Sequence, residues 1–365
     1  MKQLVVCSLE EWDDVWRRNQ FLADRLLRSD FELRILFVEP PADPLHDLLR
    51  IRRPRGLRVR TLEADRRLRT FRPLKPLPRR TGELADAALR RQVRLAARAF
   101  RFDDPVLWLN DVTYAPLIRE AGWPAVYDVT DDWLRAPLSG RELERLRRLD
   151  ELALRDAAEV VVCSPDLARS RGETRPVTLI RNAVDVEHFR RPRERPDDLP
   201  PAPVAVYLGS LHDSRLDVPL VVELARAAPE LSVALVGPDS LTPSSKAALA
   251  AEPTVHLLGA RPYADVPAYL QHADVVVVPH LVDEFTESLD PIKAYECLAV
   301  GRPTVATPVA GFRELGDSAA VVARDGFVEA VRKALAGGVG GAVTGEIPSW
   351  DERAADFAAV LRGAG

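Results

Sequence analysis

Residues 286–301 read TESLDPIKAYECLAVG and directly follow the apolar run VVVVP at 275–279. An apolar run that leads through a polar loop into a helical pattern is typical of a parallel α/β sheet. Pro291 suits the first helical position, where its missing N–H has no partner to lose, and Gly301 suits the end of the helix. The first-turn N–H groups of such a helix carry partial positive charge, so the stretch predicts a diphosphate site.

Lys293 and Glu296 lie one turn apart on the predicted helix. Lys293 would add a positive charge beside the phosphates, and Glu296 would accept hydrogen bonds from ribose hydroxyls. The alternative is an ordinary amphipathic crossover helix with a surface lysine. The order of strand, proline, lysine, glutamate and Gly-x-Pro favours the nucleotide site.

Residues 290–296, DPIKAYE, and 299–303, AVGRP, together resemble the donor-site motif of family-4-like (group 1) glycosyltransferases of the GT-B fold. That family typically carries two glutamates eight positions apart. The second matches Glu296, which the family uses on the nucleotide ribose. The first falls on Ser288, and Glu287 is one residue out of register, so the carboxylate expected against the donor sugar is missing from this motif.

The resemblance implies a glycosyltransferase that moves a sugar from a nucleotide diphosphate sugar to a hydroxyl acceptor on a polysaccharide, a lipid-linked molecule or a natural product. It favours retention of the anomeric configuration and implies no metal and no other cofactor. It assigns donor binding to Gly209, Arg215, Arg261, Ser288, Pro291, Ile292, Lys293 and Glu296. The alternatives are a degenerate module that binds a nucleotide sugar or a partner without turnover, and a pseudo-glycosyltransferase or epimerase on the same fold.

The chain has 365 residues, which is long for a single core and predicts two domains. Apolar β-branched runs alternate with helical patterns in both halves, which predicts two doubly wound parallel-sheet domains facing a cleft. The expected strands lie at 4–8, 33–38, 106–110, 125–129 and 160–164, and then at 204–209, 232–237, 255–259, 275–279 and 304–307.

The proline-rich stretch RPRERPDDLPPAP at 191–203 suits neither a helix nor a central strand, and predicts a linker. We therefore expect an acceptor-binding domain at 1–190 and a donor-binding domain at 204–348. A C-terminal helix at 349–365 would follow a glycine-rich loop and pack on the first domain, as the resemblance implies.

Residues 127–133, YDVTDDW, place three carboxylates at the carboxyl end of a predicted strand. Carboxylates are costly at a buried strand end unless they have a role or water. Asp131 would orient or deprotonate the acceptor hydroxyl, and Asp128 or Asp132 would hold a neighbouring group. Helix N-caps and a metal site are the alternatives. With Asp131 as a base, inversion of configuration is also possible.

Residues 12–20, WDDVWRRNQ, resemble the W-x-R-x-Q opening of the same subgroup, and place Arg18, Asn19 and Gln20 on the acceptor side. The alternative is a helix start whose tryptophan packs on the sheet.

Gly209 and Arg215 follow the first strand of the second domain, where a tight turn and a guanidinium would meet the diphosphate. A surface salt bridge from Arg215 to Asp213 or Asp217 is the alternative. Arg261 lies in the loop 259–262, which in the resembling family brackets the nucleotide base.

The net charge of −4 gives no pull toward nucleic acid, but arginines are dense between residues 50 and 80. That stretch is either a solvated loop or a peripheral contact with acidic lipid or an anionic acceptor. No apolar run approaches the roughly 20 residues that span a bilayer, and no signal pattern opens the chain. Cys7, Cys163 and Cys297 read as buried small hydrophobes in a reducing compartment, so we expect a cytoplasmic protein.

Overall fold

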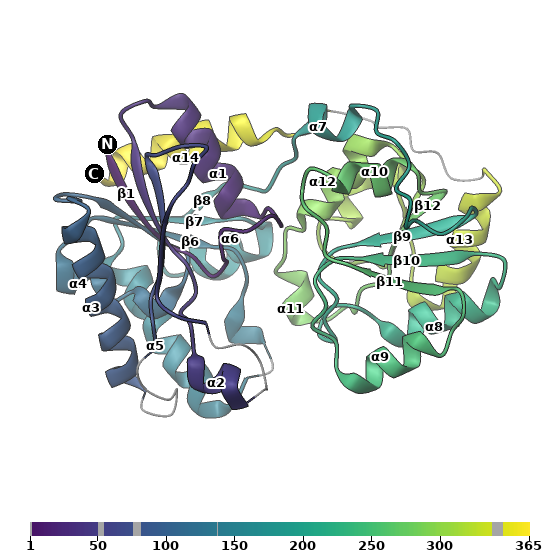
Figure 1. Ribbon diagram of the computed structural model, residues 1–365, viewed down its shortest axis with the longest axis horizontal. Coiled ribbons are helices and arrows are strands. Elements are labelled where there is room, and N and C mark those ends of the chain that lie inside the picture. The colour runs from purple at the N-terminus through teal and green to yellow at the C-terminus, as the bar shows by residue number, and fades with distance from the viewer. Residues whose placement is uncertain (1, 50–54, 76–81, 137, 338–345) are drawn as a thin grey trace. The chain divides into compact units, whose positions relative to one another are not determined.

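The computed structural model describes residues 2–49, 55–75, 82–136, 138–337 and 346–365 (Figure 1). Contacts divide the chain into two compact units. The first comprises Met1–Asp13, Arg17–Arg181 and Asp351–Gly365, and the second comprises Asp14–Trp16 and Asn182–Trp350. Each unit has one sheet covered by helices on both faces, which is the doubly wound α/β class that the sequence predicts.

The first unit has an 8-stranded sheet in the order β3-β4-β2-β1-β5-β6-β7-β8, parallel except where β3 joins β4. Its strands are β1 Gln3–Cys7, β2 Arg34–Val38, β3 Arg58–Thr61, β4 Leu68–Arg72, β5 Val106–Leu109, β6 Ala125–Val129, β7 Glu159–Val162 and β8 Thr178–Leu179. Its helices are α1 Arg18–Ser29, α2 Pro44–Leu49, α3 Glu83–Ala99, α4 Leu117–Ala121, α5 Gly140–Asp156, α6 Pro165–Gly172 and α14 Trp350–Ala364.

The two faces of this sheet carry different helices (Figure 1). Apolar residues of α3, α4 and α5 pack in one core with Val5, Leu107 and Tyr127. On the other face, α14 covers the fully buried Trp108, whose ring centroid lies 4.5 Å from that of Phe357. The segment Asp351–Gly365 therefore completes the first unit although it follows the whole second unit in the chain.

The second unit has a 6-stranded sheet in the order β11-β10-β9-β12-β13-β14, with every described pairing parallel. Its strands are β9 Val204–Leu208, β10 Ser232–Val236, β11 Val255–Gly259, β12 Val275–Val278, β13 Thr304–Ala306 and β14 Ala320–Val321. Its helices are α7 Val186–Arg190, α8 Val218–Ala227, α9 Pro243–Ala250, α10 Val266–Gln271, α11 Glu284–Glu287, α12 Ile292–Val300 and α13 Phe327–Leu335. Helices α7, α10 and α12 line one core, and α8, α9 and α13 line the other.

The change of unit falls at Arg181, before the expected boundary at residue 190. The reason is that Phe189 of α7 is fully buried in the second unit's core, beside Leu199 from the stretch expected to be a linker. Residues 191–203 therefore pack on the second unit. The glycine-rich loop falls mainly on 338–345, which lie outside the described residues.

The arginine-rich stretch contains strands β3 and β4, so a solvated loop is wrong for its described part. Its arginines face a fully buried carboxylate: Glu39 accepts hydrogen bonds from Arg58 at 2.9 Å, and Arg60 and Arg72 lie within ion-pair distance. Much of the described positive charge is thus neutralised inside the unit. The arginines at 50–54 and 76–81 lie outside the described residues.

Candidate functional site

Adjacent strands of the second unit end in glycines at one edge of the sheet. Gly209 follows β9 with φ +144°, and Gly237 follows β10 with φ +150°, a region that favours glycine. The backbones touch there: a side chain on Gly237 would come within 2.0 Å of the Gly209 carbonyl oxygen, and Gly237 N–H donates to Gly259 at 2.9 Å. The carboxyl edge of the sheet is therefore kept clear of side chains, as phosphate-binding turns require.

Lys293 reaches this glycine edge from α12. A Cβ built on Gly209 would lie 2.3 Å from the Lys293 Nζ, so a side chain at this position would displace the ammonium from the end of β9. Nζ donates to the Tyr207 hydroxyl at 3.1 Å and contacts the His280 Nε2 at 3.2 Å. The predicted pairing of Gly209 with Lys293 thus brings a cation to the end of β9.

His280 holds this lysine as a neutral ring. An ammonium only donates hydrogen bonds, so the Nε2 that it contacts must accept, which leaves the ring proton on Nδ1. Burial lowers the pKa of His280 well below its usual value, and the charges of Lys293 and Arg215 lower it further. The side chain is 5% exposed and its Nε2 also lies 3.1 Å from the Tyr207 hydroxyl.

Glu296 lies one turn further along α12 and is half-buried. Among the residues that the structure describes, none forms a hydrogen bond or ion pair with its carboxylate. Burial raises the pKa of Glu296 to about 7, and the charge of Lys293 only partly offsets this. An unpartnered, partly desolvated carboxylate is costly, and hydroxyl donors on a ligand would lower that cost.

The first turn of α12 differs from the expected one. Pro291 has an extended ψ of 120° and precedes the helix, so it is the N-cap and not the first helical residue. The added Cβ of Gly311 (φ +81°) would lie 2.7 Å from the Pro291 ring, so the ring packs against that loop. Ile292 opens the helix in its place and is half-buried.

The residues at the position of the family's first glutamate are engaged elsewhere. Ser288 is fully buried and donates its hydroxyl proton to the Phe285 carbonyl at 2.7 Å. Glu287 pairs with Arg313, whose Nη1 lies 2.7 Å from Oε1. The missing carboxylate is therefore not supplied by the neighbour in this structure.

Arg215 lies near His280, the residue that contacts Lys293. Its carbonyl accepts from Leu281 N–H at 2.8 Å, its guanidinium carbon lies 5.4 Å from the centroid of the Phe285 ring, and its charge acts on His280. The carboxylates considered as its alternative partners have others, because Asp217 binds Arg324 and Asp213 binds Thr242 and Ser245.

Arg261 is bound to neighbours at the end of β11. Its Nε donates to the Tyr269 hydroxyl at 2.6 Å, and it pairs with Asp198. These contacts hold the loop after Gly259 in one conformation.

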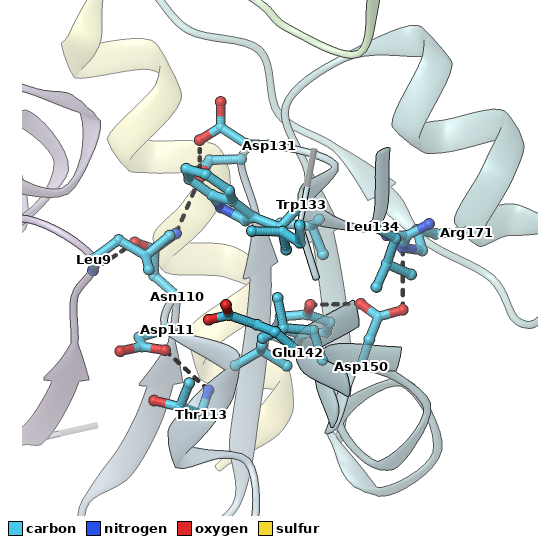
Figure 2. Close-up of a pocket in the computed structure, with 16 residues that line it drawn as sticks. Leu9, Asn110, Asp111, Thr113, Asp131, Trp133, Leu134, Glu142, Asp150 and Arg171 are labelled. Carbon is cyan, nitrogen blue, oxygen red and sulfur yellow. Dashed lines mark hydrogen bonds and ion pairs between the residues drawn. The ribbon is translucent and has the colours of Figure 1, made fainter. Parts of the chain in front are cut away.

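The first unit contains a pocket of about 390 Å³ at the carboxyl ends of β5 and β6 (Figure 2). Its polar lining includes Asp111, Asp131, Glu142, Asp150 and Arg171. In the view of Figure 2, Asp131 lies above the Trp133 ring and the other three carboxylates lie below it. Asp150 accepts from the Tyr127 hydroxyl at 2.7 Å.

Asp131 lines this pocket, and Asp128 does not. Successive side chains of a strand point to opposite faces, and Tyr127 and Val129 of β6 face the pocket. Asp128 therefore faces the other side, where it is fully buried and accepts from Arg18 at 3.2 and 3.3 Å and from Trp108 at 3.1 Å. Both of its oxygens are engaged, so in this structure Asp128 holds Arg18 and Trp108 and does not reach the pocket.

The expected acceptor-side residues lie behind the pocket wall. Arg18 is 4% exposed in the ion pair with Asp128. Asn19 donates to the Asn110 Oδ1 at 2.7 Å, and Asn110 lines the pocket. Gln20 is fully buried and donates to the Asp13 carbonyl at 2.8 Å. Asn19 thus supports the pocket wall through Asn110, and none of the three residues lines the pocket.

Several site residues were missed at the level of sequence. His280 follows β12 after Pro279, and Asn110 and Asp111 directly follow β5, although the expected strand 106–110 included Asn110. Polar residues at these positions are a usable signal, since ligands of doubly wound folds bind at the carboxyl ends of strands. Glu142, Asp150 and Arg171 reach the pocket from α5 and α6, where only tertiary packing selects them.

The described residues contain no group of three or more His, Cys, Asp or Glu side chains that could hold a metal ion. Within those residues there is also no helix with the length and apolarity needed to cross a membrane.

Comparison with known proteins shows similarity to glycosyltransferases over part of the chain. Residues 202–337 match the family model described as glycosyl transferases group 1. A curated relative, the putative teichuronic acid biosynthesis glycosyltransferase TuaH of Bacillus subtilis (strain 168), is 28% identical over 218 residues. That match covers 55% of this chain and 55% of the relative, so it spans about half of the relative's length.

Solved structures share the fold over nearly the whole chain. Anabaena Alr3699/HepE in complex with UDP-glucose has a TM-score of 0.68 at 18% identity and covers 99% of each chain. An alpha,alpha-trehalose-phosphate synthase (UDP-forming) from Burkholderia vietnamiensis has a TM-score of 0.61 at 13% identity, covering 100% of this chain and 94% of its own. These similarities confirm the predicted two-domain GT-B fold.

Proposed function

Because residues 202–337 are a glycosyl transferases group 1 domain within a GT-B fold, we propose that the protein transfers a sugar from a nucleotide diphosphate sugar to a hydroxyl acceptor. The observation that carries the proposal is the arrangement on α12. Lys293 lies against the Gly209 turn, and the unpartnered carboxylate of Glu296 lies one turn away. Lys293 would bind the anionic diphosphate of a ribosyl diphosphate, and Glu296 would accept hydrogen bonds from its ribose hydroxyls.

The second unit would bind the donor and the first unit the acceptor. The leaving nucleoside diphosphate gains negative charge as the glycosidic bond breaks. Lys293, Arg215 and the free N–H groups at the start of α12 would stabilise that charge. UDP is the first nucleotide to test, because several solved neighbours bind UDP or UDP-glucose. The resemblance favours retention of configuration.

The direct test is turnover of UDP-glucose, followed by release of UDP with and without added hydroxyl acceptors. Binding of uridine, guanosine and thymidine diphosphates is measured in parallel as a rise in melting temperature, since a ligand of the folded state stabilises it by mass action. Slow hydrolysis of a nucleotide sugar supports the enzyme. Binding of a nucleoside diphosphate without turnover of the uridine, guanosine or thymidine diphosphate sugar contradicts the proposed sugar transfer.

That second outcome is the alternative function, a module that binds a nucleotide sugar without transferring it. The observation in its favour is that Glu287 and Ser288 are both engaged in contacts of their own. An epimerase on the same fold would instead convert the sugar of the nucleotide sugar without releasing it to an acceptor, which product analysis by NMR distinguishes.

Removing the phosphate-side charge is expected to change selectivity between nucleotides. Lys293→Ala and Arg215→Ala should each weaken UDP binding by about 1.5–3 kcal/mol, the range for hydrogen bonds to charged groups, and should leave uridine affinity nearly unchanged. Calorimetric titration of both ligands measures this. Lys333→Ala, an exposed lysine on α13, is the matched control. Equal losses for UDP and uridine would show a structural effect.

A further inference from the structure

The pocket of the first unit combines an apolar wall with four carboxylates, those of Asp111, Asp131, Glu142 and Asp150. Its apolar lining includes Val112, Val129, Trp133, Leu134, Leu138 and Leu146. A volume of about 390 Å³ falls within the usual range for small-molecule sites. The apolar wall suits an apolar ligand, and the polar lining groups select the charged or polar substituent of that ligand.

Asp111 is the polar group that most needs a partner. It is 9% exposed, and its hydrogen bonds come from Thr113 within its own turn, from the N–H at 2.9 Å and from the side chain. Among the described residues, none forms an ion pair with it. Burial raises the pKa of the Asp111 carboxyl, so a lone negative charge there is costly, and a cation entering the pocket would relieve that cost.

The cations around the pocket are already in ion pairs. Arg171 donates to Asp132 at 2.9 Å and lies 3.5 Å from Asp150. Arg145, whose charge acts on Asp111, pairs with Asp86. An anionic ligand would therefore meet carboxylates and would have to break an existing ion pair to reach a guanidinium.

We infer that the acceptor of this enzyme is an apolar alcohol that carries a protonated amine, and that the pocket rejects acceptors with a carboxylate or phosphate at that position. The amine would lie beside Asp111 and Glu142, which both line the pocket and lie below Trp133 in the view of Figure 2. The apolar body would contact Trp133 and Leu146. That the ligand is a sugar acceptor rests on the proposed function. The preference for an amine over an anion rests on the pocket alone.

A matched set of probes tests the preference without any sugar transfer. Tyramine, tyrosol and 4-hydroxyphenylacetate share a phenol and differ in an ammonium, a hydroxyl or a carboxylate. We expect the full chain to bind tyramine at least about tenfold more tightly than 4-hydroxyphenylacetate, with tyrosol between them, because a charge pair in a partly desolvated pocket is worth more than one in water. NMR titration of the Trp133 indole N–H, assigned with Trp133→Phe, locates the binding.

The variant Asp111→Asn is expected to reduce the tyramine preference to within about threefold, because it removes the unpaired charge and keeps the acceptor for Thr113 N–H. The matched control is Asp104→Asn, an exposed carboxylate in the same unit, which should keep the full preference. If Asp111→Asn does not fold, Glu142→Gln takes its place with the same expectation.

The inference is overturned by equal or tighter binding of 4-hydroxyphenylacetate, by an unchanged preference in both variants, or by no binding of tyramine at millimolar concentration. UDP affinity is measured separately. If the parent chain binds none of the uridine, guanosine and thymidine diphosphates, the proposed function is contradicted, and the probes still decide the preference of the pocket.

Discussion

Replacing Glu296 by glutamine is expected to weaken UDP binding and, at the same time, to stabilise the protein without ligand at pH 8. The loss of affinity should be about 1.5–3 kcal/mol, because a charged acceptor of ribose hydroxyls becomes a neutral one. Titration calorimetry measures it, with the exposed Glu329→Gln on α13 as the matched control. An unchanged UDP affinity would remove Glu296 from the donor site.

The gain in stability follows from the raised pKa. Burial raises the pKa of Glu296 from 4.5 to about 7, so the folded state holds a proton that the unfolded state has lost between those pH values. Folding stability therefore falls as the pH rises through this window and stays lower above it. Glu296→Gln removes that loss, which is worth about 1–3 kcal/mol for a half-buried group.

Thermal unfolding at pH 4 and pH 8 checks this expectation. The variant and the parent should melt together at pH 4, and the variant should melt higher at pH 8. A variant that melts lower at both values would mean that Glu296 supports the fold. The combination of weaker binding and higher stability is the signature of a residue kept for its ligand.

The second large effect is expected for Asp131→Asn, which should lower sugar transfer by on the order of a hundredfold or more, as loss of a general base does. Asp131 lines the pocket of the first unit, is half-buried and lies 3.4 Å from the Thr130 hydroxyl. UDP affinity should hold, because Glu296 and Lys293 belong to the other unit. Steady-state rates with a fixed acceptor measure the effect, and Asp103→Asn, exposed in the same unit, is the control.

Full activity in Asp131→Asn would show that this carboxylate has a local structural role and no catalytic one. A loss of both activity and UDP affinity would instead assign it to the donor. The anomeric configuration of the product, read by NMR, adds a separate result: inversion is what a true base at Asp131 predicts, and retention is what the resemblance to the family favours.

The fold was largely predictable because its strands are short β-branched runs that end in glycine or polar residues. Strands β3 and β4 were missed because Arg58 and Arg60 alternate with Val59 and Thr61, a pattern that reads as solvated until the buried Glu39 is known. That carboxylate follows β2, on a different part of the chain. A pattern within one segment cannot identify a partner that only the sheet brings near.

The grouping of Gly209 with Lys293 in the second unit was predictable from the motif, and the lining of the first unit's pocket was only partly so. Lys293, Glu296 and Gly209 lie in recognisable contexts at strand and helix ends. Asp128 lies on the face of β6 opposite to Tyr127 and Val129, and the alternation along the strand already separates it from them. Pro291 was displaced by one position because its ring packs on Gly311, a contact that comes from a loop after β13.

The late position of α14 has a consequence for how the chain is made. Trp108 is fully buried and packs on Phe357, yet the entire second unit is synthesised between them. Domains generally fold as units when their residues have left the ribosome. The second unit is thus ready first, and the nascent first unit leaves a tryptophan-lined face open until residues 351–365 emerge. A ribosome stalled between the two would hold a folded second unit beside a first unit whose Trp108 has not yet met Phe357.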